Sequence, residues 1–467
     1  MINYTATYTD KYQLTMSQVY FLKGHEKTRA VFDYFFRKLP FNGGYAIFAG
    51  LEDLVSTLEI LRFDKHDLVY LKELGYHPDF IRYLEKFRFT GNIYSSQEGD
   101  LVFPVSPILQ IEANIIEAQI IETLLLNILN FQTLIATKAS RMRQAAEGRT
   151  LIDFGLRRAQ GPGGYYASRA AFIGGFDSTS NVVAGRDFGI PVSGTMAHSF
   201  IESYDDELSA FSQFAEVQPN DCVLVVDTYD TLKSGLPNAI TVAKKMEAKG
   251  QRLNGIRLDS GDLAYLAKES RKRLNSAGLE YVKIAVSNQL DEYIIKSLIE
   301  QQAPIDVFGV GTSLVTGHPD AALDGVYKLS MANGKPRIKL SENVSKITLP
   351  HLKQVYRIID NDSNFIGADA ITLNDEDDVQ IMHHPMYPLK SLSLIRYIKE
   401  PLLQKVMANG KRVKDSEVLS EISKYRHSRM EKLPEEYKRF DNPHIYKVGI
   451  SERLRAERDR LIDNFKK

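Results

Sequence analysis

Three short segments of the chain contain residues whose types and spacing suit chemistry on a charged substrate. Residues 194–200 place His198 among small and polar neighbours, residues 153–158 end in two arginines, and residues 257–262 combine an arginine with two aspartates. Each segment ends an apolar run, and in a sheet of parallel strands such ends gather on one face, where ligands bind. An imidazole, guanidinium groups and carboxylates on that face suit a phosphate-rich substrate.

His198 and the pair Arg257 and Asp259 are candidates for the reaction itself. His198 follows Gly194 and Thr195, which allow a backbone to approach a ligand closely and supply a hydroxyl group. A neutral imidazole acts as base, electrophile or phosphoryl acceptor, and the residues alone do not choose among these. Strand alternation puts Arg257 and Asp259 on one side, where they suit phosphate and a sugar hydroxyl or Mg²⁺; an ordinary ion pair is the alternative.

Two further segments suit binding of anions. Arg157 and Arg158 diverge if they lie on a strand, so at most one of them faces a ligand, and a helix-capping salt bridge is the alternative. Gly309, Gly311 and Thr312 lie at the end of a predicted strand and offer amides and a hydroxyl to an anion. A tight turn needs the same glycines, so this pattern alone is a weak indication.

The composition limits the class of protein. The 467 residues, 43% hydrophobic and 25% charged, predict a soluble globular chain with two domains. Lysine plus arginine equals aspartate plus glutamate at 59 each, so no bulk charge favours nucleic acid or an anionic membrane. The single cysteine, Cys222, excludes an internal disulfide framework and fits a reducing cytoplasm. No signal sequence and no apolar run of ~18 residues is evident, so we expect a cytoplasmic protein.

The elements that must position these residues alternate between short apolar runs and longer amphipathic stretches, which is typical of an α/β fold. Six predicted strands favour a parallel barrel or an open sheet: 151–155, 189–192, 223–227, 255–258, 282–287 and 307–311. Four regions are expected: an N-terminal α+β domain at 1–112, a connecting buried helix at 113–148, an α/β barrel-like catalytic domain at 149–330, and strands returning to the N-terminal domain with a charged helical region at 331–467.

Together these segments resemble the nicotinate phosphoribosyltransferases, which are type II phosphoribosyltransferases. The resemblance covers most of the chain, and its ordered matches are far more specific than any one motif: residues 9–13, 41–45, 153–158, 175–181, the His198 segment, 227–231, 257–262, 311–313 and 339–342, the last ending at Glu342. It implies an irregular parallel α/β barrel with an N-terminal α+β domain completed by C-terminal segments.

The resemblance also implies a reaction. Nicotinate and 5-phosphoribosyl 1-diphosphate would give nicotinate mononucleotide and diphosphate in NAD salvage, coupled to ATP hydrolysis, and the coupled enzyme is classed as a ligase. In the family the matching histidine is phosphorylated by ATP, so His198 would be a phosphohistidine. Mg²⁺ is the implied cofactor, with Asp227 and Asp259 as its ligands. A homodimer with shared active sites is implied as well, without nucleic acid or membrane partners.

The resemblance assigns further roles residue by residue. Phe154 from one subunit and Tyr12 from its neighbour would sandwich the pyridine ring. Arg257 would hold the substrate phosphate or carboxylate, and Asp259 the ribose hydroxyls. The remaining substrate-binding residues would be Arg157, Asn181, Thr195, Ser199, Gly311 and Thr312, with Gly311 and Thr312 at the 5-phosphate.

Three alternatives remain beside this function. The relative that uses nicotinamide carries an aspartate where this chain has Asn181, and a carboxylate there would repel nicotinate, so the acid substrate is favoured. Quinolinate phosphoribosyltransferase shares the barrel but is shorter and independent of ATP. A non-catalytic sensor of NAD metabolites would retain the pocket, but the intact His198, Arg257 and Asp259 argue against decay of the site.

Overall fold

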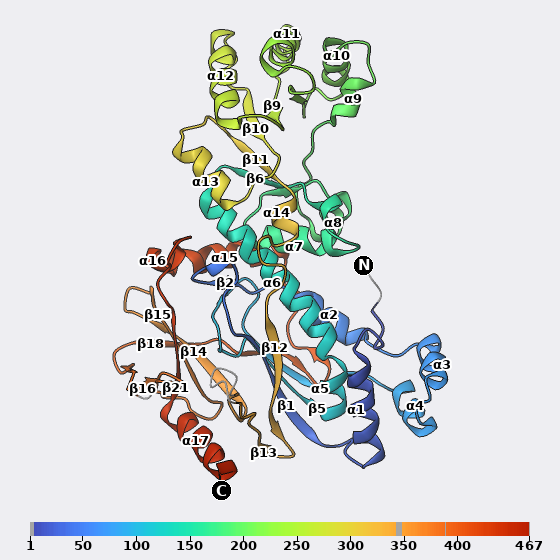
Figure 1. The fold of residues 1–467 in the computed structure, drawn as a ribbon, viewed down its shortest axis with the longest axis vertical. Coiled ribbons are helices and arrows are strands. Elements are labelled where there is room, and N and C mark those ends of the chain that lie inside the picture. Colours follow the sequence, from blue (N-terminus) through green and yellow to red (C-terminus); the bar gives the residue numbers. More distant parts are fainter. Residues whose placement is uncertain (1–3, 342–347, 388, 467) are drawn as a thin grey trace. The chain divides into compact units, whose positions relative to one another are not determined.

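A computed structural model describes residues 4–341, 348–387 and 389–466, which form two compact units (Figure 1). Unit 1 consists of Met1–Thr137 and Ala322–Lys467, and unit 2 of Lys138–Ala321. Helix α6 (Glu122–Ala145) begins in unit 1 and ends in unit 2. Glu342, the last residue of one motif in the sequence, lies outside the described residues.

Unit 2 is built on a sheet of six parallel strands. Their order is β7-β6-β11-β10-β9-β8, with β6 at Thr150–Asp153, β7 at Ser178–Thr179, β8 at Val223–Val225, β9 at Gly255–Leu258, β10 at Lys283–Val286 and β11 at Val307–Val310. These runs are short, apolar and mostly buried, as expected of parallel strands joined by helices. The helical connections are η2 (Leu156–Arg158), α7 (Gly163–Gly174), α8 (Val182–Phe188), α9 (His198–Glu202), α10 (Glu207–Val217), η3 (Thr231–Gly235), α11 (Leu236–Glu247), α12 (Leu263–Ser276), α13 (Glu292–Glu300) and α14 (Thr312–Val315).

The α/β class predicted from the sequence is confirmed, and five of the six predicted strands are present. The prediction of a strand at residues 189–192 is wrong. Gly189 is the left-handed C-cap of α8, with φ of 68°, and Pro191 has no N–H to give to a ladder. Only an isolated bridge from Thr179 to Val192 forms there, so β7 is the edge strand. Within the described chain, the edge strands β7 and β8 do not pair with each other.

Unit 1 contains two large sheets and one small one. The first has the order β13-β12-β1-β5-β3-β19-β20, the second β17-β16-β21-β15-β14-β18, and β2 pairs with β4. The bounds are β1 Arg29–Phe36, β2 Ala46–Ile47, β3 Asn92–Ser95, β4 Leu101–Val102, β5 Leu109–Asn114, β12 Gly325–Ala332, β13 Lys335–Pro336, β14 Lys353–Ile359, β15 Phe365–Leu373, β16 Ile381–His383, β17 Ser391–Ser393, β18 Ile398–Pro401, β19 Gln404–Ala408, β20 Lys411–Arg412 and β21 Lys447–Ser451. Because β12 pairs with β1 and β19 with β3, C-terminal strands complete the N-terminal sheet, as the resemblance implied.

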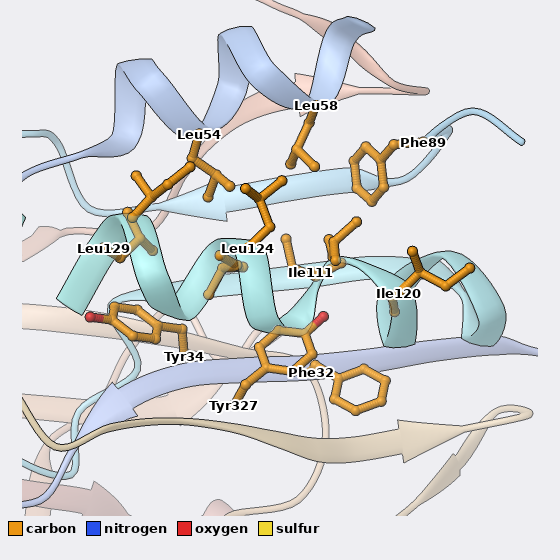
Figure 2. Packing of buried hydrophobic residues seen from close by; sticks show 14 of the residues in the cluster. Phe32, Tyr34, Leu54, Leu58, Phe89, Ile111, Ile120, Leu124, Leu129 and Tyr327 are labelled. Carbon is orange, nitrogen blue, oxygen red and sulfur yellow. The ribbon is translucent and has the colours of Figure 1, made fainter. Parts of the chain in front are cut away.

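One hydrophobic core of unit 1 lies between helices and the first sheet, and two smaller ones lie on the second sheet. Figure 2 shows Leu54 and Leu58 of α2 directed toward Leu124 of α6, while Phe32 of β1 and Tyr327 of β12 lie on the other side of α6. The rings of Phe32 and Tyr327 stack with centroids 4.7 Å apart. The helices are α1 (Lys11–Leu22), η1 (Pro40–Asn42), α2 (Leu51–Ile60), α3 (Lys65–Glu73), α4 (Pro78–Glu85), α5 (Ile115–Ile120), α6, α15 (Leu419–Lys432), α16 (Glu435–Lys438) and α17 (Glu452–Lys466). None of the described helices is long and apolar enough to cross a membrane.

A buried ionic cluster joins the two halves of the sequence within unit 1. Nη1 of Arg357 lies 2.7 Å from Oδ1 of Asp100, and its Nη2 lies 3.0 Å from Oδ2 of Asp369. Arg429 of α15 also contacts Asp100, with Nε 2.9 Å from Oδ1. Burial opposes ionisation of Asp100, but Arg357 and Arg429 outweigh it and lower the pKa of this carboxyl group. The C-terminal helix α15 is therefore fixed to the N-terminal strands by charge pairs as well as by apolar contacts.

Candidate active site

The carboxyl ends of β8, β9 and β10 bring ionisable side chains together in unit 2. Asp227 follows β8, Arg257 is in β9 with Asp259 just beyond it, and Ser287 follows β10. Successive parallel strands end at the same edge, which is why residues far apart in the sequence meet here. The sequence predicts Asp227, Arg257 and Asp259 at this edge, and the structure brings them together there.

Arg257 and Asp259 form the centre of this group. Nη2 of Arg257 lies 2.8 Å from Oδ1 of Asp259, and its Nη1 donates to Thr195 Oγ1 at 3.0 Å. Ser287 joins both residues, since its hydroxyl accepts from Arg257 Nε at 2.8 Å and donates to Asp259 Oδ1. Burial opposes ionisation of Asp259, but the hydrogen bond from Ser287 and the charge of Arg257 prevail and lower its pKa. Asp259 is therefore held as a carboxylate.

His198 begins α9, and its two ring nitrogens face different groups. Nδ1 lies 3.0 Å from Thr228 Oγ1, whereas Nε2 lies 3.9 Å from Asp227 Oδ1 and 3.7 Å from Asp259 Oδ2. The ring is 39% exposed, so a ligand reaches it from solvent. The imidazole is thus held between one hydroxyl and two carboxylates, and it remains accessible.

One carboxylate oxygen of Asp227 accepts hydrogen bonds, and the other accepts none from the described residues. Its Oδ2 accepts from the backbone N–H of Asp259 at 2.8 Å and from Ser260 Oγ at 2.6 Å. Its Oδ1 is buried and has no hydrogen-bond partner among the described residues. An unpaired buried carboxylate oxygen beside a second carboxylate suits a bound cation. The described residues contain no group of three acidic, histidine or cysteine side chains able to hold a metal alone, so further ligands would come from a substrate.

Phe154 lies against this group from the end of β6. The guanidinium carbon of Arg257 is 5.4 Å from the centroid of the Phe154 ring. The ring also lies on the backbone of β11, because a Cβ added to Gly309 would lie only 2.4 Å from its Cε2. Glycine at position 309 is therefore required for the ring to lie there.

The structure leaves other predicted site residues without such contacts. Arg157 and Arg158 do not lie on a strand, because β6 ends at Asp153 and both arginines lie in η2. Both are exposed, and neither side chain has a hydrogen-bond or ion-pair partner among the described residues. Ser199 and Thr312 are also exposed, near the starts of α9 and α14.

Three other predicted site residues, Gly311, Tyr12 and Asn181, lie in different surroundings. Gly311 adjoins Phe154, since an added Cβ there would lie 3.4 Å from the Phe154 carbonyl oxygen. Tyr12 lies on α1 of unit 1 and is 52% exposed. Asn181 is buried and caps α8, with Oδ1 accepting from the Ala184 N–H at 3.3 Å and Nδ2 donating to Ser168 Oγ at 3.3 Å. Its side chain is thus engaged inside the protein.

Two contacting residues, Thr228 and Ser287, are not among the site residues expected from the sequence. Thr228 lies inside the motif at 227–231, and Ser287 ends the strand predicted at 282–287. Their common signal is a hydroxyl at the carboxyl end of a strand, the same position that singled out Asp259. By contrast, Asp262, the last residue of its motif, caps α12 by accepting from the Tyr265 N–H at 3.0 Å.

One imidazole, one guanidinium group and two carboxylates thus lie together at the carboxyl edge of a parallel sheet. This arrangement is typical of an α/β enzyme that acts on a charged substrate. Sequence profiles of nicotinate phosphoribosyltransferases match the chain in three parts: the N-terminal domain at residues 7–130, the family core at 150–384 and the C-terminal domain at 352–457. The chain belongs to the nicotinate phosphoribosyltransferase family.

Individual relatives agree over nearly the whole length. A Bacillus subtilis nicotinate phosphoribosyltransferase is 47% identical over 457 residues, covering 95% of this chain and 92% of the relative. A Mycobacterium tuberculosis nicotinate phosphoribosyltransferase is 41% identical, covering 98% and 94%. The crystal structure of human nicotinic acid phosphoribosyltransferase superposes with a TM-score of 0.86 at 31% identity, covering 97% of this chain and 99% of that one.

Proposed function

We propose that this chain joins nicotinate to the ribosyl phosphate of 5-phosphoribosyl 1-diphosphate and releases nicotinate mononucleotide and diphosphate, as an entry step of cytoplasmic NAD salvage. We further propose that ATP hydrolysis drives the reaction through a phosphohistidine at His198. The family supports the transfer reaction. The observation that carries the ATP coupling is the exposed His198 ring, which lies between Thr228 and the two carboxylates.

The two sides of the imidazole have different roles in this proposal. Asp227 and Asp259 face Nε2, and carboxylates in that position favour a hydrogen on Nε2. The lone pair of Nδ1 then accepts from the Thr228 hydroxyl, which orients the ring and rotates away when an electrophile approaches Nδ1. Attack of Nδ1 on the γ-phosphorus of ATP forms the N–P bond, breaks the bond to the β-phosphate oxygen and releases ADP.

Asp227 and Asp259 would hold Mg²⁺ together with phosphate oxygens of the substrates. The unpaired Oδ1 of Asp227 and the ionised Asp259 supply the oxygen ligands that this ion prefers. The ion would neutralise charge on the diphosphate as it leaves. The two carboxylates would also hold the ribose hydroxyls and the Nε2 hydrogen in place.

The aromatic and cationic groups suit nicotinate. Phe154 offers a ring face, and Arg257 beside it offers a guanidinium group to the substrate carboxylate or phosphate. Thr195 donates or accepts at the same place, since it already contacts Arg257. Arg157, Ser199, Gly311 and Thr312 are proposed to bind the diphosphate and the 5-phosphate. Transfer passes through an oxocarbenium-like state, so the residues act by orienting the ring nitrogen and stabilising the leaving group.

Two parts of the proposal concern specificity and assembly. Asn181 is buried at the start of α8 and adds no negative charge near the site, so we propose that it favours nicotinate over nicotinamide because no extra carboxylate opposes the acid. Tyr12 is exposed on α1 and free to cover the ring bound by another copy of the chain, so we propose a homodimer with composite sites.

A turnover assay of the purified chain tests this function. The protein is incubated with 5-phosphoribosyl 1-diphosphate and either nicotinate or nicotinamide, with and without ATP and Mg²⁺, and mononucleotide is quantified. We expect turnover of nicotinate in strong preference to nicotinamide, and a clear stimulation by ATP. Equal use of both pyridines would exclude the specificity. If neither pyridine gave a product, the result would favour the alternative that the chain is a non-catalytic sensor of NAD metabolites.

A further inference from the structure

Asp153 is a buried carboxylate, 1% exposed, at the carboxyl end of β6 and directly before Phe154. Oδ1 accepts from the backbone N–H of Gly155 at 2.8 Å, and Oδ2 accepts from Ser168 Oγ at 2.7 Å and Thr179 Oγ1 at 2.8 Å. All three donors are neutral, and no described cation forms an ion pair with this group. Burying a carboxylate without a cation costs free energy of folding, so we expect a role that explains why Asp153 lies there.

The donors to Asp153 come from elements that surround the Phe154 segment. Ser168 belongs to α7, and Thr179 belongs to β7. Thr179 Oγ1 also accepts from the backbone N–H of Asn181 at 3.1 Å, at the start of α8. One carboxylate thus ties α7, β7 and the start of α8 to the point where β6 ends.

The Phe154 backbone is fixed on both sides by hydrogen bonds. Its own N–H donates to the carbonyl of Val310 in β11 at 2.8 Å, and the next N–H, that of Gly155, donates to Asp153. A carboxylate that accepts from the N–H two residues ahead closes a tight turn around the residue between. This turn ends β6 at Asp153 and directs the Phe154 ring onto Gly309, beside Arg257.

We propose that Asp153 is a positioning residue for the pyridine substrate: it fixes the Phe154 ring at the angle at which the substrate ring stacks and couples that angle to α7 and α8. The inference rests on the proposed function for the identity of the stacked ring. The hydrogen bonds of Asp153 in the described part of the chain go to Gly155, Ser168 and Thr179 and not to Arg257, Asp259 or His198, so it acts on binding of the pyridine and not on phosphoryl transfer.

Steady-state kinetics of Asp153→Asn test this role. The amide keeps one acceptor for the Gly155 N–H but turns an NH₂ group toward Ser168 or Thr179. We expect the KM for nicotinate to rise about tenfold, with the KM for 5-phosphoribosyl 1-diphosphate and the ATP-dependent labelling of the protein changed by less than about twofold. The matched control is Asp177→Asn, because Asp177 accepts from the Leu151 N–H at 2.8 Å near the other end of β6. That control should leave both KM values near those of the wild type.

A second measurement does not depend on turnover. The chain contains no tryptophan, so Phe154→Trp introduces a single indole at the stacking position, which is excited separately from the 24 tyrosines. Without any substrate, adding Asp153→Asn to this variant should lower the fluorescence anisotropy of the indole and increase its quenching by acrylamide. Adding Asp177→Asn should change neither. If the wild-type chain does not turn over nicotinate, the proposed function fails while this measurement still decides the role of Asp153.

Defined results overturn the inference. Unchanged anisotropy together with an unchanged KM for nicotinate would show that Asp153 does not position Phe154. An equal rise of both KM values with a lower melting temperature, matched by Asp177→Asn, would show a purely structural role. If Asp153→Asn does not accumulate as folded protein, Ser168→Ala replaces it in the test. This variant removes one hydrogen-bond donor to Asp153, and alanine is well tolerated in helix α7. The KM for nicotinate should again rise while the KM for 5-phosphoribosyl 1-diphosphate does not, but by a smaller factor.

Discussion

Nε2 of His198 lies 3.7 Å from Oδ2 of Asp259, a carboxylate that Arg257 and Ser287 hold in its ionised form. The other ring nitrogen, Nδ1, lies within hydrogen-bond distance of the Thr228 hydroxyl. One nitrogen is therefore directed at negative charge and the other at a neutral hydroxyl. This asymmetry determines which nitrogen is left for an electrophile, and it makes the proposed coupling to ATP testable residue by residue.

Replacement of His198 by alanine should abolish phosphorylation. Protein incubated with γ-labelled ATP and Mg²⁺ should carry label that acid removes and alkali does not, and nicotinate with 5-phosphoribosyl 1-diphosphate should discharge it. His198→Ala should carry no label and lose the stimulation by ATP, while slow ATP-independent transfer persists because the substrates are still held. His427→Ala, at an exposed histidine of unit 1, is the control and should label normally. Stoichiometric label on His198→Ala would place the phosphate elsewhere.

Thr228 should set the rate of that phosphorylation. Thr228→Val is close in shape but removes the hydroxyl 3.0 Å from Nδ1. We expect labelling to slow by roughly two- to tenfold, the rate equivalent of a hydrogen bond worth about 1 kcal/mol. Thr228→Ser restores the hydroxyl and should restore most of the rate. Rapid-quench measurement of labelled protein is the readout, and equal rates for both variants would rule out the orienting role.

Tyr12 should act on the site of a neighbouring subunit. Tyr12→Ala should raise the KM for nicotinate without dissociating the dimer, and Tyr12→Phe, which keeps the ring, should change it little. Mixing Tyr12→Ala with Arg257→Ala should restore one competent site in each heterodimer. Activity that stays at the level of the separate variants after confirmed subunit exchange would argue that each site is built from one chain.

Substitution of Asn181 by aspartate should impair the use of nicotinate. The Nδ2 group of Asn181 donates to Ser168 Oγ, which Asp153 also contacts, so a carboxylate at 181 loses a donor and brings a second negative charge to the same hydroxyl. We expect kcat/KM for nicotinate to fall by an amount equivalent to about 1–3 kcal/mol. Asn181→Ser keeps a neutral helix cap and should have the smaller effect. Identical kinetics for wild type and Asn181→Asp would remove this residue from specificity.

The stability of unit 1 should depend on the ionisation of Asp100. Asp100→Asn leaves the buried Arg357 and Arg429 without their shared carboxylate and should lower the free energy of unfolding by about 3–5 kcal/mol at neutral pH. Because the native pKa of Asp100 is depressed, its contribution is present above the ordinary carboxyl value of 3.8 and is lost as the pH falls through the native value.

Urea unfolding of wild type and Asp100→Asn checks this prediction. Their difference should be constant from neutral pH to about pH 5 and shrink below 3.8. Asp375→Asn, which breaks an exposed pair with Arg453, should have little effect at any pH. A difference for Asp100→Asn as small as that for Asp375→Asn would contradict the assignment.

The sequence predicted five of the six strands of unit 2 and the edge where the candidate site residues meet, because apolar runs and the residues that end them are local patterns. Residues 255–258 form β9 as predicted, and Asp259 follows it. The sequence could not predict that Asn181 faces inward or that Ser287 links Arg257 to Asp259, because the direction of a side chain depends on packing between distant segments. The strand expected at 189–192 failed for a local reason, since Pro191 cannot donate to a ladder.

The order of synthesis differs from the order in which this molecule can fold. Unit 2 is continuous in sequence, whereas strand β1 of unit 1 acquires its neighbour β12 only after the whole of unit 2 has been made. During translation all residues of unit 2 are therefore synthesised before unit 1 is complete. Until then, the edge of β1 that pairs with β12 in the finished protein has no partner. A chain that stopped directly after unit 2 would contain all of that unit but would leave β1 without β12 as its neighbour.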